Sequence, residues 1–306
     1  MAEGVTTPPR RRRRTSMQRS QAIAGWAFSL PFVLVFLVFS AWPILWSLFM
    51  SFTNMTSRDL RDPFYVDFVG LENFARVLGD PDFRRAMLVT AAIAVVAVPV
   101  TIVVALLIAV ALNRGIRRFK TFFRTAFYVP VVTSIVAIAV VWTLLFDRNG
   151  VVNGLLDTVG IDGPDWLGDT TWALPTVTLL VIWRLFGLIM VLFLAGLQAI
   201  PDDLYEAAEI DGAGTWRRLF SITVPLMVPS ILLATVLLTV AIIQVFEEPY
   251  VITQGGPLGS TTSAAMYIFN EFGYGRYAAA SAASYLLFAF IAFLSFLQFR
   301  LLRSRT

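Results

Sequence analysis

The most constraining feature of this chain is a series of long apolar stretches without a charged side chain. Five of them occupy residues 20–57, 86–113, 125–146, 219–246 and 277–299, and a sixth, 170–201, is interrupted only by Arg184. A helix that crosses a bilayer needs about 20 apolar residues, whereas a membrane-barrel strand shows about ten residues of alternating polarity. The pattern therefore predicts transmembrane helices, and six of them.

The composition agrees with a chain that lies in a membrane. Hydrophobic residues make up 58% and charged residues 14% of the 306 positions, against about 25% charged residues in ordinary soluble proteins. So few charges could not cover the surface of a soluble fold, and so many apolar residues exclude bulk disorder. The predicted fold is all-α and integral to the membrane, with helices near residues 24–50, 87–112, 125–146, 172–197, 226–248 and 278–299.

The missing residue types exclude several kinds of chemistry. The chain contains no Cys and no His, which excludes disulfides, zinc sites and every catalytic triad that uses either residue. Its one lysine, Lys120, stands between Phe119 and Thr121, so the phosphate-binding pattern GxxxxGK[ST] does not occur. We therefore expect no catalytic residue, no metal, and no ATP site of this familiar type.

The positive charges predict the orientation in the membrane. Of 24 Lys and Arg residues, 16 lie in the two tails and in the connections 113–124 and 198–221, and only 7 lie in the other three connections. Because positive charges favour the cytoplasmic side, both termini are expected in the cytoplasm and loop 147–171 outside. The chain would then be a multi-pass protein of the cell (inner) membrane.

The chain divides into a basic tail, residues 1–21, and one membrane domain, residues 22–306. The tail contains the run Arg10–Arg14. It could bind nucleic acid, but a cytoplasmic tail attracted to anionic lipid is the favoured interpretation. Between the first two spans, Leu71, Phe74 and Val77 have helical spacing, which indicates either a short amphipathic helix at the outer interface or a simple connector.

A second short helix is expected in the connection 198–221. Asp203 can serve as its N-cap, with Glu206 three residues later as in a capping box, and Gly212 suits the left-handed position after the last turn. A helix of about nine residues is marginal alone in water, so its own membrane domain or a partner must hold it.

This connection carries a recognisable pattern. Glu206-Ala207-Ala208 is followed after three residues by Gly212, and nine residues later by Ile222-Thr223-Val224-Pro225. The spacing resembles the EAA signature of binding-protein-dependent ABC importer permeases, with Val224 in place of a leucine. Leu197–Pro201, Thr253–Pro257 and the entry to the third span are similar to the carbohydrate-uptake group, and to its maltose-transporter-like first permease.

The resemblance implies a function, partners and docking residues. The chain would be a permease subunit for a sugar, oligosaccharide or polyol, working with a second permease, two ATPase subunits that bind the ATP, and an extracytoplasmic solute-binding protein. The short helix would be the cytoplasmic coupling helix that docks on an ATPase subunit, through Leu204, Tyr205, Glu206, Ala207, Ala208, Asp211 and Gly212. The alternatives are a permease for another solute, such as glycerol phosphate, and a membrane-embedded enzyme.

The solute path is expected near the one charge inside a span. Arg184 would face the bundle interior or a wet cavity, because a charge at this depth is costly in lipid. Trp183 could stack on a sugar or pack as an ordinary aromatic side chain. Gln244 and Glu247 of the fifth span are further candidates for this path. Alternatively, Arg184 pairs with a carboxylate and fixes helix packing.

Overall fold

The computed structural model describes residues 16–62, 65–115 and 119–303, and it divides into two compact units, residues 1–50 and 51–306. The first unit contains α1 (Ser16–Phe36), the π-helical turn η1 (Leu37–Ala41) and most of α2 (Trp42–Ser51). Within the described residues there is no strand, only an isolated bridge between Thr53 and Phe68. The basic run Arg10–Arg14 lies outside the described residues.

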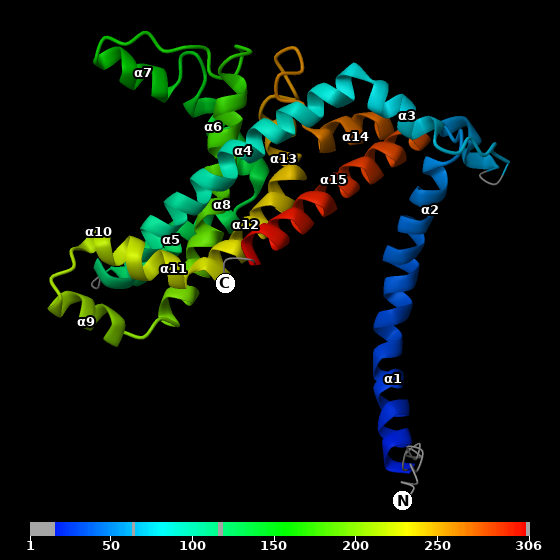
Figure 1. Cartoon of the computed structure of the whole chain (residues 1–306). Coiled ribbons are helices and arrows are strands. Elements are labelled where there is room, and N and C mark those ends of the chain that lie inside the picture. Colours follow the sequence, from blue (N-terminus) through cyan, green and yellow to red (C-terminus); the bar gives the residue numbers. More distant parts are fainter. Residues whose placement is uncertain (1–15, 63–64, 116–118, 304–306) are drawn as a thin grey trace, which may run out of the picture. The chain divides into compact units, whose positions relative to one another are not determined.

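The second unit is built from helices joined by short connections (Figure 1). In chain order they are η2 (Ser57–Arg61), α3 (Glu72–Gly79), α4 (Pro81–Val110), η3 (Ala111–Gly115), α5 (Lys120–Val132), α6 (Ile135–Leu145), α7 (Val151–Thr158), α8 (Ala173–Gln198), α9 (Asp203–Ile210), α10 (Thr215–Arg218), η4 (Leu219–Thr223), α11 (Val224–Leu226), α12 (Val228–Ile243), α13 (Glu247–Ile252), α14 (Ala264–Gly273) and α15 (Tyr277–Arg303).

The helices agree with the prediction of six membrane spans if the bent pair α5 and α6 counts as one span. Five helical stretches are long and apolar enough to cross a bilayer: Ile23–Ser51, Pro81–Asn113, Ala173–Gln198, Val228–Ile252 and Tyr277–Arg300. The bent pair α5 and α6 supplies the sixth. The short helix expected between the first two spans is also present, as α3.

The third span differs from the continuous helix that the sequence suggested. Its two halves, α5 and α6, meet at an angle of 100°. Thr133, just after α5, has an extended backbone, and its hydroxyl donates to the carbonyl of Val129 at 2.7 Å. Pro130 cannot donate a helical hydrogen bond near the bend. An apolar run of this length therefore located the span without revealing its break.

The apolar core of the second unit lies between α4, α8 and α12. Fully buried side chains from all three helices meet there, among them Ile93, Ala97, Met190, Phe193, Leu238 and Ile242. The bent helix α5 approaches α8 closely at Gly187, where a Cβ atom would overlap the carbonyl oxygen of Phe127. The long helices thus form one packed scaffold that fixes the shorter segments at their ends.

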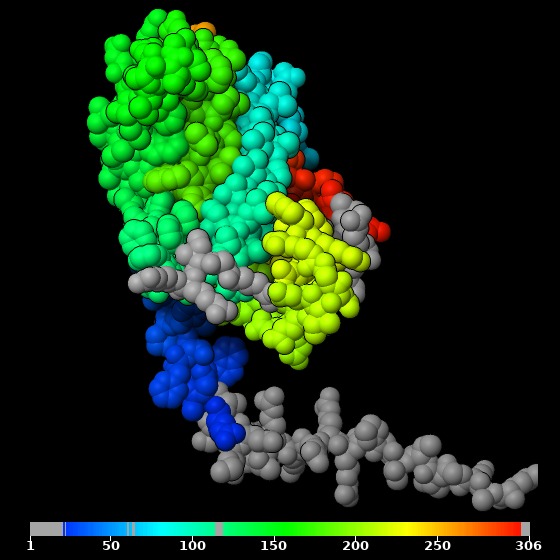
Figure 2. All heavy atoms as spheres, turned by 90° about the vertical axis from the view of Figure 1, so that its left-hand side faces the viewer, coloured from blue at the N-terminus to red at the C-terminus, as the bar shows by residue number. Residues whose placement is uncertain are grey.

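The short segments gather at two opposite ends of this scaffold. Helix α7 lies at one end, and α9 with α10 lies at the other (Figure 1). In the space-filling view, the green residues of the α7 region and the yellow-green residues of the α9–α10 region again occupy opposite ends (Figure 2). The two connections assigned to opposite sides of the membrane are thus separated in space.

Candidate translocation and docking sites

Helix α9 begins and ends close to where the sequence indicated. Its N-cap is Asp202, one residue earlier than predicted, because the backbone N–H of Glu206 donates to the carbonyl of Asp202 at 3.1 Å. The predicted capping box on Asp203 is therefore wrong, and Asp203 lies in the first turn. Gly212 has a φ of +72°, which confirms the predicted left-handed stop.

Most side chains of α9 are exposed. Leu204 is 44% and Ile210 is 88% exposed, Glu206 and Ala207 are exposed, and Ala208 is half-buried. The region forms a projection at its end of the second unit (Figure 2). Exposed apolar side chains on so short a helix are suited to contact with another surface.

Tyr205 differs from the other residues predicted for docking because it is buried, with 6% of its surface exposed. Its hydroxyl forms a hydrogen bond of 2.9 Å with Oγ1 of Thr223, the last residue of η4. One turn later, Glu209 Oε2 lies 2.9 Å from Nη1 of Arg218. These two contacts hold one face of α9 against the segment that leads into the fifth span.

Arg184 is paired with two carboxylates. Its Nη2 lies 2.7 Å from Oε1 of Glu248, and its Nη1 lies 3.4 Å from Oε2 of Glu247. Glu248 is 1% exposed, so this contact is a buried ion pair, whereas Glu247 is exposed. Glu248 was not among the predicted path residues; its place beside Glu247 at the end of the fifth span was the available signal.

The expected path residues meet only in part. Arg184, Gln244 and Glu247 line one cavity of about 420 Å³ between α8 and the end of the fifth span. This span is not the continuous helix expected over 226–248, because α12 ends at Ile243 and α13 starts at Glu247. The turn between them brings the amide and both carboxylates to the cavity wall.

Trp183 does not line that cavity. Its ring packs against Trp142 of α6, with centroids 5.6 Å apart, and further aromatic pairs continue through Phe146 to Trp166 and Trp172. This arrangement matches the alternative in which Trp183 is an ordinary packing residue. The aromatic chain joins α8 and α6 to the loop that follows α7.

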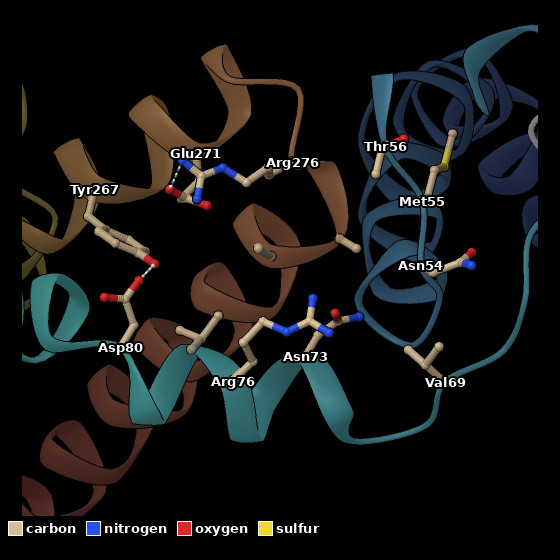
Figure 3. Close-up of a pocket in the computed structure, with 13 residues that line it drawn as sticks. Asn54, Met55, Thr56, Val69, Asn73, Arg76, Asp80, Tyr267, Glu271 and Arg276 are labelled. Atoms are coloured by element: carbon tan, nitrogen blue, oxygen red, sulfur yellow. Dashed lines mark hydrogen bonds and ion pairs between the residues drawn. The ribbon is translucent and has the colours of Figure 1, made fainter. Parts of the chain in front are cut away.

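A second polar cluster joins α14 to the start of α4 (Figure 3). The Tyr267 hydroxyl donates to Oδ2 of Asp80 at 2.6 Å, and Arg276 Nη2 lies 3.3 Å from Oε1 of Glu271. Burial raises the pKa of the Tyr267 hydroxyl, and its hydrogen bond to Asp80 adds to the shift. Burial also raises the pKa of Glu271, with Asp80 and Asp82 adding to it and Arg276 opposing it.

The charged groups of this second cluster have partners within the chain. Its cavity of about 160 Å³ is bounded by paired groups from α4, α14 and the residue before α15. Tyr267 and Asp80 are 187 positions apart in the sequence. The cluster thus acts as a structural clasp, which sequence spacing could not have revealed.

The long apolar helices and the polar cavity beside a break in a span are consistent with an integral membrane transport protein. A family model described as "Binding-protein-dependent transport system inner membrane component" matches residues 97–306. The chain belongs to this family of inner-membrane transport components. It is thus a permease subunit, as the EAA pattern indicated.

Individual relatives are similar in sequence to this chain along most of its length. The lactose transport system permease protein LacF of Rhizobium radiobacter is 37% identical over 261 residues, which cover 84% of this chain and 86% of the relative. The trehalose/maltose transport system permease protein MalF of Thermococcus litoralis is 33% identical over 268 residues, covering 87% and 89%.

Chains in solved structures have a fold similar to that of this chain. A chain from a bacterial ABC transporter involved in the import of the acidic polysaccharide alginate gives a TM-score of 0.81 at 25% identity, covering 94% of this chain and 98% of that one. A second structure is that transporter in complex with an alginate pentasaccharide-bound periplasmic protein, also with a TM-score of 0.81.

Proposed function

We propose that this permease subunit forms part of the import path for a neutral sugar, oligosaccharide or polyol. The observation that carries the proposal is the pairing of Arg184 with both Glu247 and Glu248 in one cavity. One cation facing two carboxylates gives no excess of positive charge for an anion. An amide, a guanidinium and carboxylate oxygens together offer donors and acceptors that suit hydroxyl groups.

The names of the relatives support the same solute class. Two of them are permeases of lactose and of trehalose/maltose transport systems. The transporter of the structural neighbour imports an acidic polysaccharide, but the carboxylates of this cavity disfavour an acidic solute. A glycerol phosphate permease, the alternative from the sequence, has the same difficulty.

A solute test should leave the buried ion pair intact. Arg184→Ala would leave Glu248 buried without its ion partner, a change that typically costs about 3–5 kcal/mol, so lost transport could reflect lost assembly. Gln244→Leu removes a hydrogen-bonding group and leaves both carboxylates paired. We expect Gln244→Leu to lower solute uptake without lowering the amount of permease in the membrane. Gln244→Asn should retain part of the uptake.

The charge of the solute can be tested separately. The partner solute-binding protein should bind lactose, maltose or trehalose in a ligand screen and should not bind glycerol phosphate. Glu247→Gln removes one negative charge, so uptake of an anionic solute should rise and uptake of a neutral one should not. Selective binding of glycerol phosphate, with uptake that rises in Glu247→Gln, would contradict the proposal.

We further propose that α9 is the cytoplasmic coupling helix that docks on an ATPase subunit. Its exposed apolar side chains and the small Ala207 and Ala208 support this role. Leu204, Glu206, Asp211 and Gly212 would complete the contact, and Tyr205 would support it from the buried face. A second permease, two ATPase subunits that bind ATP, and an extracytoplasmic solute-binding protein complete the transporter.

Copurification tests the docking proposal. Ala208→Trp adds bulk to the contact surface, so the ATPase subunit should no longer copurify, although the permease accumulates normally. Ala213→Trp, a change just beyond the helix, serves as the matched control. Full copurification with Ala208→Trp would show that α9 is not the docking element.

The same account places both termini and α9 in the cytoplasm and α7 outside. Because the chain contains no Cys, single cysteines at positions 212 and 162 can be labelled with an impermeant thiol reagent. In intact cells, position 162 should react, provided that the reagent reaches the outer face of the membrane in which the chain lies. Position 212 should react only after lysis. The opposite labelling pattern would invert the topology.

A further inference from the structure

We infer that Tyr205 and Thr223 form a latch that makes α9 move together with the start of the fifth span. The inference rests on the proposed docking of α9 and concerns how its movement reaches the membrane. Tyr205 is the positioning residue: it contacts neither solute nor ATP and acts through Thr223. Their hydroxyl groups, 18 positions apart, form a buried hydrogen bond of 2.9 Å.

The covalent connection between α9 and the fifth span is poorly suited to transmit movement. It passes through Asp211–Gly214, which contains two glycines, one of them at a φ of +72°. It then passes through the four-residue helix α10, the π-helical segment η4 and the three-residue helix α11 before α12 begins. Glycine has the greatest backbone freedom, and π-helical turns are rare and occur often at functional sites.

The side-chain contacts bypass this connection. Tyr205 and Glu209 are four residues apart and therefore lie on one face of α9. The first bonds Thr223 at the end of η4, and the second pairs with Arg218 immediately before it. Two links one turn apart resist both sliding and rotation of α9 relative to η4, which one link would not.

The burial pattern separates the latch from the docking surface. Tyr205 and Thr223 are 6% and 3% exposed, whereas Leu204 and Ile210 on other faces of α9 are 44% and 88% exposed. The hydrogen bond is therefore protected from water and remains available while the exposed face contacts a partner. Glu209 is exposed and its ion pair contributes less, since solvent screens it.

The test uses the permease in its complete transporter, reconstituted in nanodiscs with its purified binding protein. Thr223→Val removes the hydroxyl and keeps the shape, and Thr223→Ser keeps the hydroxyl as the matched control. For Thr223→Val, the stimulation of ATP hydrolysis by the binding protein should fall about five-fold, the factor by which losing one ordinary hydrogen bond shifts an equilibrium. Basal hydrolysis and copurification of the ATPase subunit should remain, and Thr223→Ser should stay near wild type.

Tyr205→Phe completes a double-mutant cycle with Thr223→Val. It should lower the stimulation like Thr223→Val, and the losses should be less than additive in the double variant, because all three variants lack the Tyr205–Thr223 bond. Thr223→Val also removes a 3.4 Å bond to the carbonyl of Arg218. The exposed Tyr65 supplies a control, Tyr65→Phe. Wild-type stimulation in Thr223→Val, or additive losses in the double variant, would overturn the latch. If the ATPase subunit copurifies fully with the Ala208→Trp permease, the docking proposal fails instead.

Discussion

Helices α9 and α14 are similar in length but differ in what surrounds them. Four residues of α14 are buried, and two of these, Tyr267 and Glu271, have partners within the chain. Only one residue of α9 is buried, and its apolar Leu204 and Ile210 are exposed. The comparison indicates that α14 is part of the packed scaffold, whereas α9 has the exposed surface that the docking proposal requires.

The largest expected effect comes from the same substitution made in both helices. Ala264 at the start of α14 is fully buried, and its N–H donates to Thr90. Ala264→Trp should cost more than about 3 kcal/mol by overpacking, and the protein should fail to accumulate in the membrane. Ala208→Trp in α9 should accumulate normally. Equal accumulation of the two variants, measured by immunoblotting of membranes, would remove the distinction.

The clasp should affect stability and not coupling. Tyr267→Phe removes the hydrogen bond to Asp80, and bonds to charged groups contribute about 1.5–3 kcal/mol. We expect a lower unfolding temperature of the purified complex, with normal stimulation of ATP hydrolysis by the binding protein. Tyr205→Phe, in contrast, should impair this stimulation. A Tyr267→Phe variant with normal stability and impaired stimulation would contradict this assignment.

Two glycines that follow the end of α9 differ in backbone conformation. Neither Gly212 nor Gly214 has an atom within 4 Å of an added Cβ, but Gly212 has a φ of +72° and Gly214 a φ of −66°. Gly212→Val should therefore strain the end of α9 by about 1–2 kcal/mol, whereas Gly214→Val should not. Impaired ATPase coupling in the first variant alone is the expected result, measured as binding-protein-stimulated hydrolysis; equal effects would show that backbone conformation is not the cause.

The smallest effect concerns pH. The folded pKa of Glu271 is raised above its unfolded value near 4.3, so its contribution to stability is complete at low pH and is lost as the pH rises through the folded pKa. The groups around it are Asp80 and Asp82 of the α4 region, Tyr267 and Arg276. Relative to Glu271→Gln, the unfolding temperature of the wild type should fall as the pH rises above the unfolded pKa of about 4.3. Glu72→Gln, at an exposed site, should show no such trend; a constant difference between wild type and Glu271→Gln would contradict the assignment.

Local sequence signals predicted local features of α3 and α9. The spacing of Leu71, Phe74 and Val77 predicted α3, and the glycine after the last turn of α9 predicted its left-handed stop, because such features depend on neighbouring residues. The capping prediction missed by one residue, since adjacent Asp202 and Asp203 are equally good N-cap residue types.

Contacts between distant segments could not be predicted in the same way. Arg184 was recognised as an unusual charge, but its pairing with Glu248 depends on the turn between α12 and α13. The clasp joins residues 187 positions apart, and the bend between α5 and α6 lies inside an uncharged run, marked only by Pro130, Thr133 and Ser134. Hydrophobicity located the spans, whereas packing between helices determined how they bend and which polar groups meet.

The most direct measurement of the central claim is ATP hydrolysis by the complete transporter in nanodiscs, with and without its solute-loaded binding protein. In the wild type, the loaded binding protein should stimulate hydrolysis. In Ala208→Trp, which enlarges a half-buried side chain of α9 and alters no membrane span, the stimulation should be absent although the permease is correctly inserted. Stimulation at the wild-type level in this variant would contradict the assignment of α9 as the element that couples the permease to ATP.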